Sequence, residues 1–221
     1  MKHIIKKHAY HWAQKSFIES TILGFVFFAL SIIINYFAGK YASSLADQPV
    51  TDLILNILPV IYIEPIFIQG FITFLIILLI LIFIEPKRIP FILKSFSLFV
   101  LIRSFFIILT HIGPYPAVYD IQHGVLLNNF LFTGDLFFSG HTGLPFLMAL
   151  IFWKNVVWRY IFLLLTVIFS ITVLLGHIHY SIDVFGAIFI TYAIYHLSIY
   201  LFKKDYTLFE SAMEINNKKS N

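Results

Sequence analysis

The sequence contains no cysteine, and only 12% of its 221 residues are charged. The absence of cysteine excludes disulfide bonds, thiol nucleophiles and thiolate metal ligands. The scarcity of charge, together with a hydrophobic content of 60% and a mean hydropathy of +0.90, lies far from the composition of a soluble globular domain. The sequence therefore indicates an integral membrane protein whose apolar side chains are covered largely by lipid.

Six apolar runs predict an all-α, polytopic fold with six transmembrane helices, because each run approaches the roughly 20 residues that cross a bilayer. They divide the chain into a cytoplasmic N-terminal segment (1–16), a single membrane domain (17–202) and a cytoplasmic tail (203–221). After the first run, "ADQPVTDLILNILPVIYIEP" mixes acids and prolines with short apolar pieces, and we expect an interfacial or re-entrant segment there. The six runs are 17–38, 66–84, 91–112, 139–158, 160–178 and 184–202.

Basic residues are distributed unevenly over the predicted loops. Twelve of the fifteen lysines and arginines fall on one side, and the cytoplasmic side of a membrane normally holds this excess. This distribution predicts that both termini are cytoplasmic, and it explains the formal net charge of +4 without a nucleic-acid partner. The twelve are Lys2, Lys6, Lys7, Lys15, Lys87, Arg88, Lys154, Arg159, Lys203, Lys204, Lys218 and Lys219.

Two polar clusters, "GDLFFSGHTG" (134–143) and "HIHYSID" (177–183), then lie together on the non-cytoplasmic face. His179 and Asp183 are four residues apart, which at a helix start places a carboxylate one turn from an imidazole. Such a carboxylate fixes the tautomer of the ring and stabilises a developing imidazolium. This is the environment of a nucleophile.

The first cluster supplies a second imidazole, His141, near the beginning of the fourth apolar run. Ser139 and Gly140 precede it at the helix start, where backbone N–H groups are free to meet an anion. The two clusters therefore suggest a site for an oxyanion.

These motifs resemble those of the type 2 phosphatidic acid phosphatase superfamily, and most closely its sphingomyelin synthase-like branch. "GDLFFSGHT" is similar to the branch's Ser-Gly-His-Thr motif with its preceding Gly-Asp, and "HIHYSIDV" is similar to its His-Tyr-x-x-Asp motif. The six-span layout agrees, and the arginine of "LIRSFFIILTHIGPYP" is similar to an intramembrane arginine of that branch. The likeness covers the expected catalytic core, about 103–202, whereas the N-terminal half agrees in architecture alone.

The resemblance implies a lipid phosphotransferase or phosphatase that works through a phosphohistidine. His179 would attack phosphorus, Asp183 would orient it, and His141 would protonate the leaving oxygen and then deprotonate the acceptor. The partners would be a phospholipid and an acceptor, either water or a lipid hydroxyl from the bilayer, and no metal ion or cofactor is implied. The residues expected to bind substrate are Arg103, Ser139, Gly140, Asp135 and Tyr180.

The number of cations distinguishes this chain from the phosphatases of the superfamily, which typically present a lysine and two arginines to a dianionic monoester. No K-x6-R-P element is present, and Val173 stands six residues before His179, where the phosphatase motif has arginine. Arg103 is then almost the only cation that the sequence offers to the substrate phosphate. We therefore expect a phosphodiester substrate, since its single negative charge is better matched to about one cation in a low dielectric.

Three function classes stay open at this level: a head-group transferase, a hydrolase of the same fold that uses water, and a non-catalytic lipid-binding relative. For the two histidines and Asp183 the structural alternative is a satisfied polar cluster between helices. Asp135 serves equally well as a helix N-cap, and Arg103 as the partner of a helix-end carbonyl or a loop acid. A metal site is disfavoured because the sequence offers no second carboxylate cluster.

Five aromatic residues near the two clusters have two alternative explanations. An aromatic cage for a quaternary ammonium head group and an interfacial aromatic belt explain Tyr115, Tyr119, Phe137, Phe138 and Tyr180 equally well. The remaining histidines are expected at the interface (His177, His111 and His196) or in a loop (His123).

Overall fold

The computed structural model describes residues 2–116 and 134–220, and these residues form helices and loops without any strand. The predicted all-α fold is therefore confirmed for this part of the chain. The helices in chain order are α1 (Lys2–Trp12), α2 (Lys15–Ser44), the π-helix η1 (Pro65–Gly70), α3 (Phe71–Ile84), the 3-10 helix η2 (Pro86–Arg88), α4 (Ile89–Leu109), α6 (Gly140–Ile151), α7 (Val156–Leu175), α8 (Ser181–Leu201) and α9 (Lys203–Ser220).

In the part of the chain that the structure describes, five helical stretches are long and apolar enough to cross a membrane: α2, η1 with α3, η2 with α4, α7 and α8. Each has at least 20 residues, and at 1.5 Å per residue such a helix matches a hydrocarbon core of about 30 Å. Large apolar side chains point outward from them; Phe189 is 76% exposed. Such a surface is stable against lipid and not against water, which identifies an integral membrane protein.

The fourth predicted span differs from the expectation. The sequence predicts one crossing helix over 139–158, but α6 has 12 residues and measures about 18 Å. It ends at Ile151, and Asn155 caps the next helix by accepting a hydrogen bond from the Trp158 N–H at 3.1 Å. The apolar run therefore contains the whole of α6 and the first residues of α7. Residues 2–116 and 134–220 contain five candidate spans where six were predicted for the chain.

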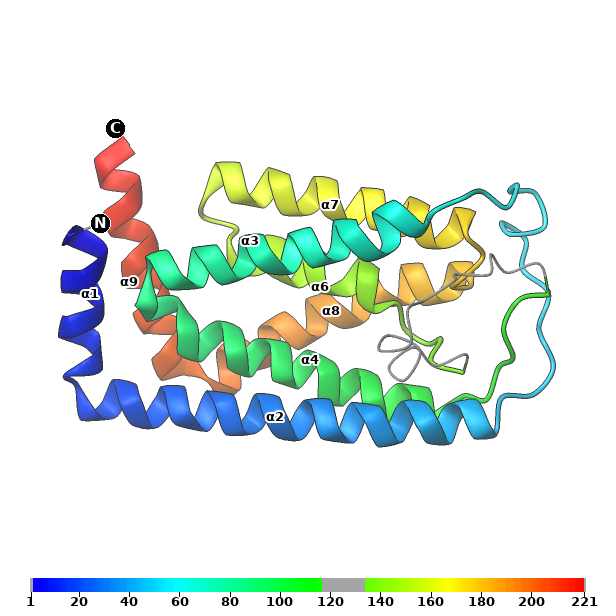
Figure 1. Cartoon of the computed structure of the whole chain (residues 1–221), viewed down its shortest axis with the longest axis horizontal. Helices are drawn as coiled ribbons and strands as arrows, with labels where there is room; N and C mark the ends of the chain where they lie inside the picture. The colour runs from blue at the N-terminus through cyan, green and yellow to red at the C-terminus, as the bar shows by residue number, and fades with distance from the viewer. Residues whose placement is uncertain (1, 117–133, 221) are drawn as a thin grey trace.

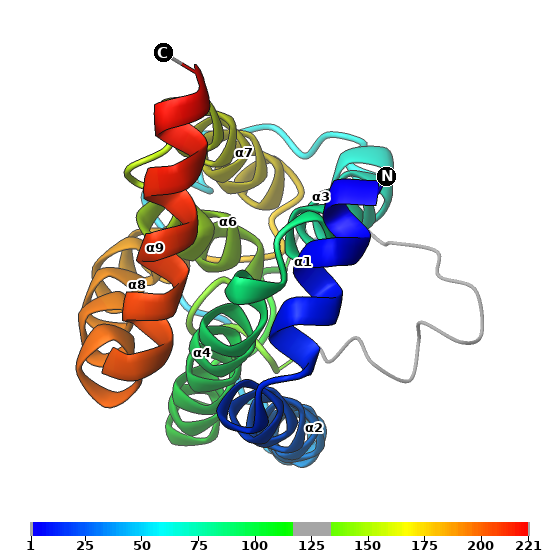
Figure 2. The same cartoon turned by 90° about the vertical axis from the view of Figure 1, so that its left-hand side faces the viewer.

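The short helix α6 lies at the centre of the bundle. Seen along the bundle, α3, α4, α7 and α8 surround it (Figure 2). Leu147, Met148 and Ala149 of α6 have no exposed surface. In Figure 1, α6 begins part of the way along α2 and α8 and not at their ends, so the segment 134–139 that precedes it reaches into the bundle.

Both termini lie at one end of the bundle, where α1 and α9 cross it (Figures 1 and 2). The predicted cytoplasmic tail is thus helical over almost its whole length. Asp205 of α9 is buried and lies 2.6 Å from the Nζ of Lys94, a buried residue of α4, and Ser20 of α2 bonds to both. The carboxylate compensates the charge of Lys94 inside the bundle and fixes α9 to α2 and α4.

The segment predicted to be interfacial or re-entrant is a non-helical loop, residues 45–63, at the opposite end of the bundle (Figure 1). Several of its exposed side chains are large and apolar, with Leu53 at 80% and Ile57 at 77%. Asp52, Leu55 and Ile63 of the same loop are buried against the protein. We refer to residues 45–63 as the cover loop.

Candidate active site

The first turn of α8 holds a histidine against a buried carboxylate. Asp183 is the third residue of α8, and its Oδ2 accepts a hydrogen bond from the Tyr180 N–H at 2.9 Å, a contact typical of an acidic residue near a helix N-terminus. The same Oδ2 lies 3.3 Å from Nδ1 of His179. Asp183 has no exposed surface and His179 is 5% exposed. Because Nδ1 faces the carboxylate, Nε2 is the ring nitrogen left for chemistry.

The segment 134–139 connects this turn to the start of α6. The backbone N–H of Ser139 donates to the carbonyl of Asp183 at 3.1 Å. The side chain of Ser139 caps α6 by accepting from the Thr142 N–H at 3.4 Å. Ser139 is fully buried. One residue therefore joins the two polar clusters and holds the start of α6 against the first turn of α8.

His141 follows in the first turn of α6 and sits among aromatic rings. Its ring stacks on Phe67 of η1 at a centroid distance of 4.1 Å and is tilted against Phe71 of α3 at 4.3 Å. His141 lies within electrostatic range of His179 and Arg103. The rings of Phe67 and Phe71 shield its imidazole.

Arg103 of α4 binds the extended segment directly. Its Nη1 lies 2.7 Å from Oδ1 of Asp135, its Nη2 donates to the Asp135 carbonyl at 3.1 Å, and its Nε donates to the Phe138 carbonyl at 2.7 Å. The pairing with a loop acid and with carbonyl oxygens, one alternative from the sequence, is what the structure shows. A Cβ atom placed on Gly140 would lie 3.5 Å from Arg103 Nε, so the guanidinium also borders the N-terminus of α6.

The aromatic residues for which a cage and an interfacial belt were equally good explanations lie in two places. Tyr180 is 2% exposed, and its hydroxyl donates to the Gly113 carbonyl at 2.8 Å and accepts from the Val50 N–H at 3.2 Å. Tyr115 packs edge-on against Tyr180, and its hydroxyl donates to Asn56 at 2.5 Å. Phe137 and Phe138 instead pack against Phe106 of α4. Tyr119 and His123 lie outside the described residues, and substrate binding by Tyr180 stays a prediction.

The cover loop supplies contacts that the sequence does not predict. Asp52 accepts hydrogen bonds from the backbone N–H and the hydroxyl of Ser181, the first residue of α8, at 2.7 and 2.8 Å. Burial raises the pKa of Asp52, but hydrogen bonds from Leu55, Ser181 and Ile54 outweigh it and hold the pKa below its ordinary value. His177, expected at the interface, is 3% exposed, and its Nε2 lies 3.2 Å from the Leu58 carbonyl.

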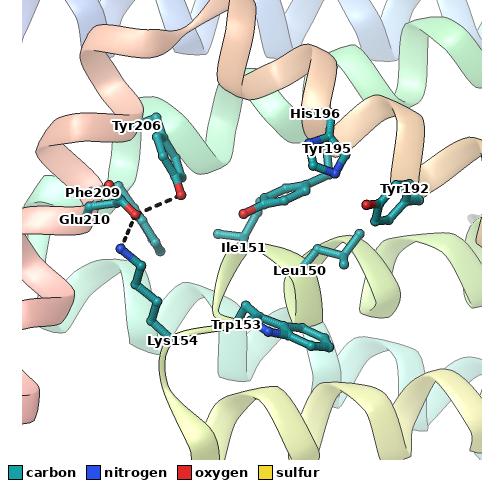
Figure 3. A pocket seen from close by; sticks show the side chains of 10 residues that line it. All are labelled: Leu150, Ile151, Trp153, Lys154, Tyr192, Tyr195, His196, Tyr206, Phe209 and Glu210. Carbon is teal, nitrogen blue, oxygen red and sulfur yellow. Dashed lines mark hydrogen bonds and ion pairs between the residues drawn. The ribbon is translucent and has the colours of Figure 1, made fainter.

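A cavity of about 330 Å³ at the other end of the bundle is separate from this cluster (Figure 3). It lies between α6, α8 and α9 and is lined mainly by aromatic and apolar side chains, among them Trp153, Tyr192 and Phe209. Its two charged groups are paired with each other, since Glu210 lies 2.5 Å from Lys154, and Glu210 also accepts from Tyr206 at 2.9 Å. We therefore place the candidate active site at the starts of α6 and α8.

Residues 132–200 match a family model described as PAP2 superfamily C-terminal. The matched region contains both polar motifs and every helix from α6 to the last turn of α8. The match supports the type 2 phosphatidic acid phosphatase superfamily, whose members are phosphatases or phosphotransferases. No curated protein and no solved structure matches the chain.

Proposed function

We propose that the protein is a lipid phosphotransferase of the sphingomyelin synthase-like type, which moves a phosphate-containing head group between lipids through a phosphohistidine. The observation that carries the proposal is the buried His179–Asp183 pair, joined through Ser139 to the N-terminus of α6. A nucleophile with an orienting carboxylate lies there beside backbone N–H groups that suit a phosphate oxygen.

In the first step, Nε2 of His179 attacks the phosphorus of a phospholipid. The new N–P bond replaces the P–O bond to the diacylglycerol, and the leaving oxygen takes a proton from His141. Asp183 balances the positive charge that develops on the His179 ring. The N–H groups at the start of α6 and the guanidinium of Arg103 stabilise the charge on the phosphoryl oxygens.

In the second step, the hydroxyl of an acceptor lipid gives its proton to His141 and attacks the same phosphorus. The P–N bond breaks, His179 regains its lone pair, and the head group leaves on the acceptor. His141 acts as an acid in one step and as a base in the other, so one turnover restores its protonation state.

The charge of the site supports a phosphodiester donor. Arg103 is paired with Asp135 at 2.7 Å, so its positive charge is already partly balanced. A dianionic monoester would bring a second negative charge next to Asp135 and Asp183 without a further cation. In a low dielectric this repulsion costs more than the same contact in water. A monoanionic diester avoids it.

The surroundings of His141 support a lipid acceptor over water. Phe67 and Phe71 pack on the ring of the proposed base, and Phe169 approaches it edge-on at 6.1 Å. Apolar rings at this position leave few polar partners for an attacking water and suit a hydroxyl that arrives with its acyl chain. Hydrolysis is accordingly the second candidate, and the acceptor assay below distinguishes the two.

We also propose that the bundle crosses the membrane six times with both termini in the cytoplasm, α6 and the segment 134–139 forming the fourth crossing together. The distribution of basic residues supports it. The basic segments α1, η2 and α9 lie at one end of the bundle, whereas the starts of α6 and α8 and the cover loop lie toward the other (Figure 1). The end of a membrane protein that is rich in lysine and arginine is normally the cytoplasmic one. The active site would then open on the non-cytoplasmic face.

The proposal is tested by incubating the purified protein in detergent with labelled ceramide, diacylglycerol and phosphatidylcholine, and resolving the lipid products. We expect a new phospholipid from the native protein, none from His179→Ala, and a normal yield from the control His196→Ala, which changes an exposed histidine at the opposite end. Release of water-soluble phosphocholine or phosphate without transfer would favour the hydrolase. Turnover that survives in His179→Ala would refute the mechanism.

A further inference from the structure

We infer that Asp52 is a positioning residue for the phosphoryl transfer: it anchors the N-terminus of α8 and so keeps His179 aligned with Asp183. The inference rests on the proposed function. Asp52 lies 129 residues before its partner Ser181, in the cover loop, and both matched motifs lie outside that loop. Its hydrogen bonds in the described residues go to Ile54, Leu55 and Ser181 and not to His141 or His179, so its effect on the reaction is exerted through the backbone of α8.

The two carboxylate oxygens of Asp52 bind different parts of the protein. Oδ1 accepts from the N–H groups of Ile54 and Leu55 at 2.9 and 3.0 Å and folds the cover loop into a turn. Oδ2 accepts from the N–H and the hydroxyl of Ser181 at 2.7 and 2.8 Å. Asp52 is 6% exposed. A buried carboxylate with four donors is a strong and directional link between the loop and the helix.

Ser181 stands between the two members of the catalytic pair. Asp183 binds the backbone of this turn through the Tyr180 N–H, and Asp52 binds it through the next N–H along the chain. The N-terminus of α8 is thus held by two carboxylates, an arrangement that the helix dipole favours. If Asp52 releases Ser181, the turn that carries His179 loses one of these two attachments.

Further residues of the cover loop contact the chain segment that carries His179. Leu55 is 2% exposed and packs with Tyr180 and Leu136. The Leu58 carbonyl meets His177, and the Ile61 N–H donates to the Leu175 carbonyl at 2.9 Å. The cover loop therefore contacts the chain on both sides of His179, and Asp52 is its charged contact with α8.

The step most sensitive to such alignment is the attack on phosphorus, because a displacement of about 1 Å from the reactive geometry lowers a rate by roughly a hundredfold. We expect Asp52→Asn to lower the single-turnover rate constant by roughly tenfold to a hundredfold while KM for the donor lipid changes little. An amide has one acceptor oxygen, so this variant cannot satisfy both the loop turn and Ser181.

A second variant breaks the same link from the other side. Ser181→Pro removes both donors to Asp52 at the first position of a helix, where proline is well tolerated. The preceding Tyr180 has φ −68° and ψ 158°, which a following proline also permits. We expect the same loss of rate, and a double variant with Asp52→Asn that is little slower than either single variant.

The readout separates positioning from folding. Misfolded protein lowers the amplitude of a single-turnover burst but leaves the rate constant of the folded fraction unchanged. Asp205→Asn is the matched control, because it breaks a buried carboxylate pair at the opposite end of the bundle. We expect it to lower stability and burst amplitude with a native rate constant.

Two results would overturn the inference, and they are distinguishable. If Asp52→Asn and Ser181→Pro keep the native rate constant and lose only amplitude, as Asp205→Asn is expected to, then Asp52 supports the fold alone. In that case the proposed function stands, provided His179→Ala is inactive. If His179→Ala turns over, the proposed function itself fails, and the inference fails with it.

Discussion

Arg103 of α4 and Asp135 of the extended segment form an ion pair, with 2.7 Å between Nη1 and Oδ1. The guanidinium of Arg103 borders the N-terminus of α6, and its positive charge is there partly neutralised by the Asp135 carboxylate. It therefore connects the position of the segment that carries Ser139 with the charge that a phosphate group would meet.

Replacing Asp135 by asparagine should change substrate preference. The variant leaves the Arg103 guanidinium without its counter-charge, and a dianionic monoester gains more from that than a monoanionic diester does. We expect the ratio of monoester to diester turnover to rise roughly tenfold, equivalent to ~1.4 kcal/mol, even if both rates fall. Parallel assays with phosphatidic acid and phosphatidylcholine measure the ratio. A ratio equal to that of the native protein would contradict the charge argument.

Two glycines of α6 should respond in opposite ways to alanine. At Gly140 the new Cβ meets Arg103 at an ordinary contact distance of 3.5 Å, so Gly140→Ala should fold normally but crowd the proposed phosphate site. At Gly143 it would lie 2.6 Å from the ring of Phe99, and such overpacking typically costs about 1–3 kcal/mol. Thermal unfolding and activity should therefore separate: Gly140→Ala loses activity, and Gly143→Ala loses stability.

The contribution of Asp52 to stability should disappear in acid. Hydrogen bonds hold its pKa below the ordinary value in the folded protein, so the ionised form stabilises the fold at neutral pH. This contribution is fully present above the unfolded pKa of about 3.9 and is lost as the pH falls through the lower folded pKa. The melting temperatures of native protein and Asp52→Asn should thus differ at pH 7 and converge below pH 4. A constant difference would show that the carboxylate charge is irrelevant.

Chelation should leave activity unchanged. The proposed chemistry uses a nitrogen nucleophile, a proton donor and one guanidinium, and none of its steps needs a metal ion. The measurement is head-group transfer before and after prolonged dialysis against EDTA. Loss of activity that returns with a divalent cation would require a different mechanism.

The local part of the site was predictable from the sequence, and its long-range part was not. The four-residue spacing of His179 and Asp183 at a helix start leaves little freedom, and the structure has the two side chains in contact. The link between Asp52 and Ser181 spans 129 residues, and neither residue carries a local pattern that indicates the other. The sequence offered one signal for Asp52, an acid directly before the apolar run Leu53–Leu55 of the cover loop.

The fold differs from the sequence prediction at residues 139–158 and in the C-terminal tail, and in both places specific polar contacts decide the structure. The apolar run over 139–158 has the composition of one span, but its division depends on the Asn155 cap and on the extended segment bound by Arg103, which hydropathy does not register. The last residues are too polar to predict a packed helix. Pairing of Asp205 with Lys94 nevertheless attaches α9 to the bundle.

The central claim is that His179 becomes covalently bound to the head group during turnover. The direct measurement incubates the protein with phospholipid labelled with ³²P in its head group, quenches in alkali, where a phosphohistidine survives, and maps the label by peptide mass spectrometry. We expect label on His179 that disappears when an acceptor lipid is added and that is absent from His179→Ala. Turnover without labelled enzyme, or label on another residue, would contradict the mechanism.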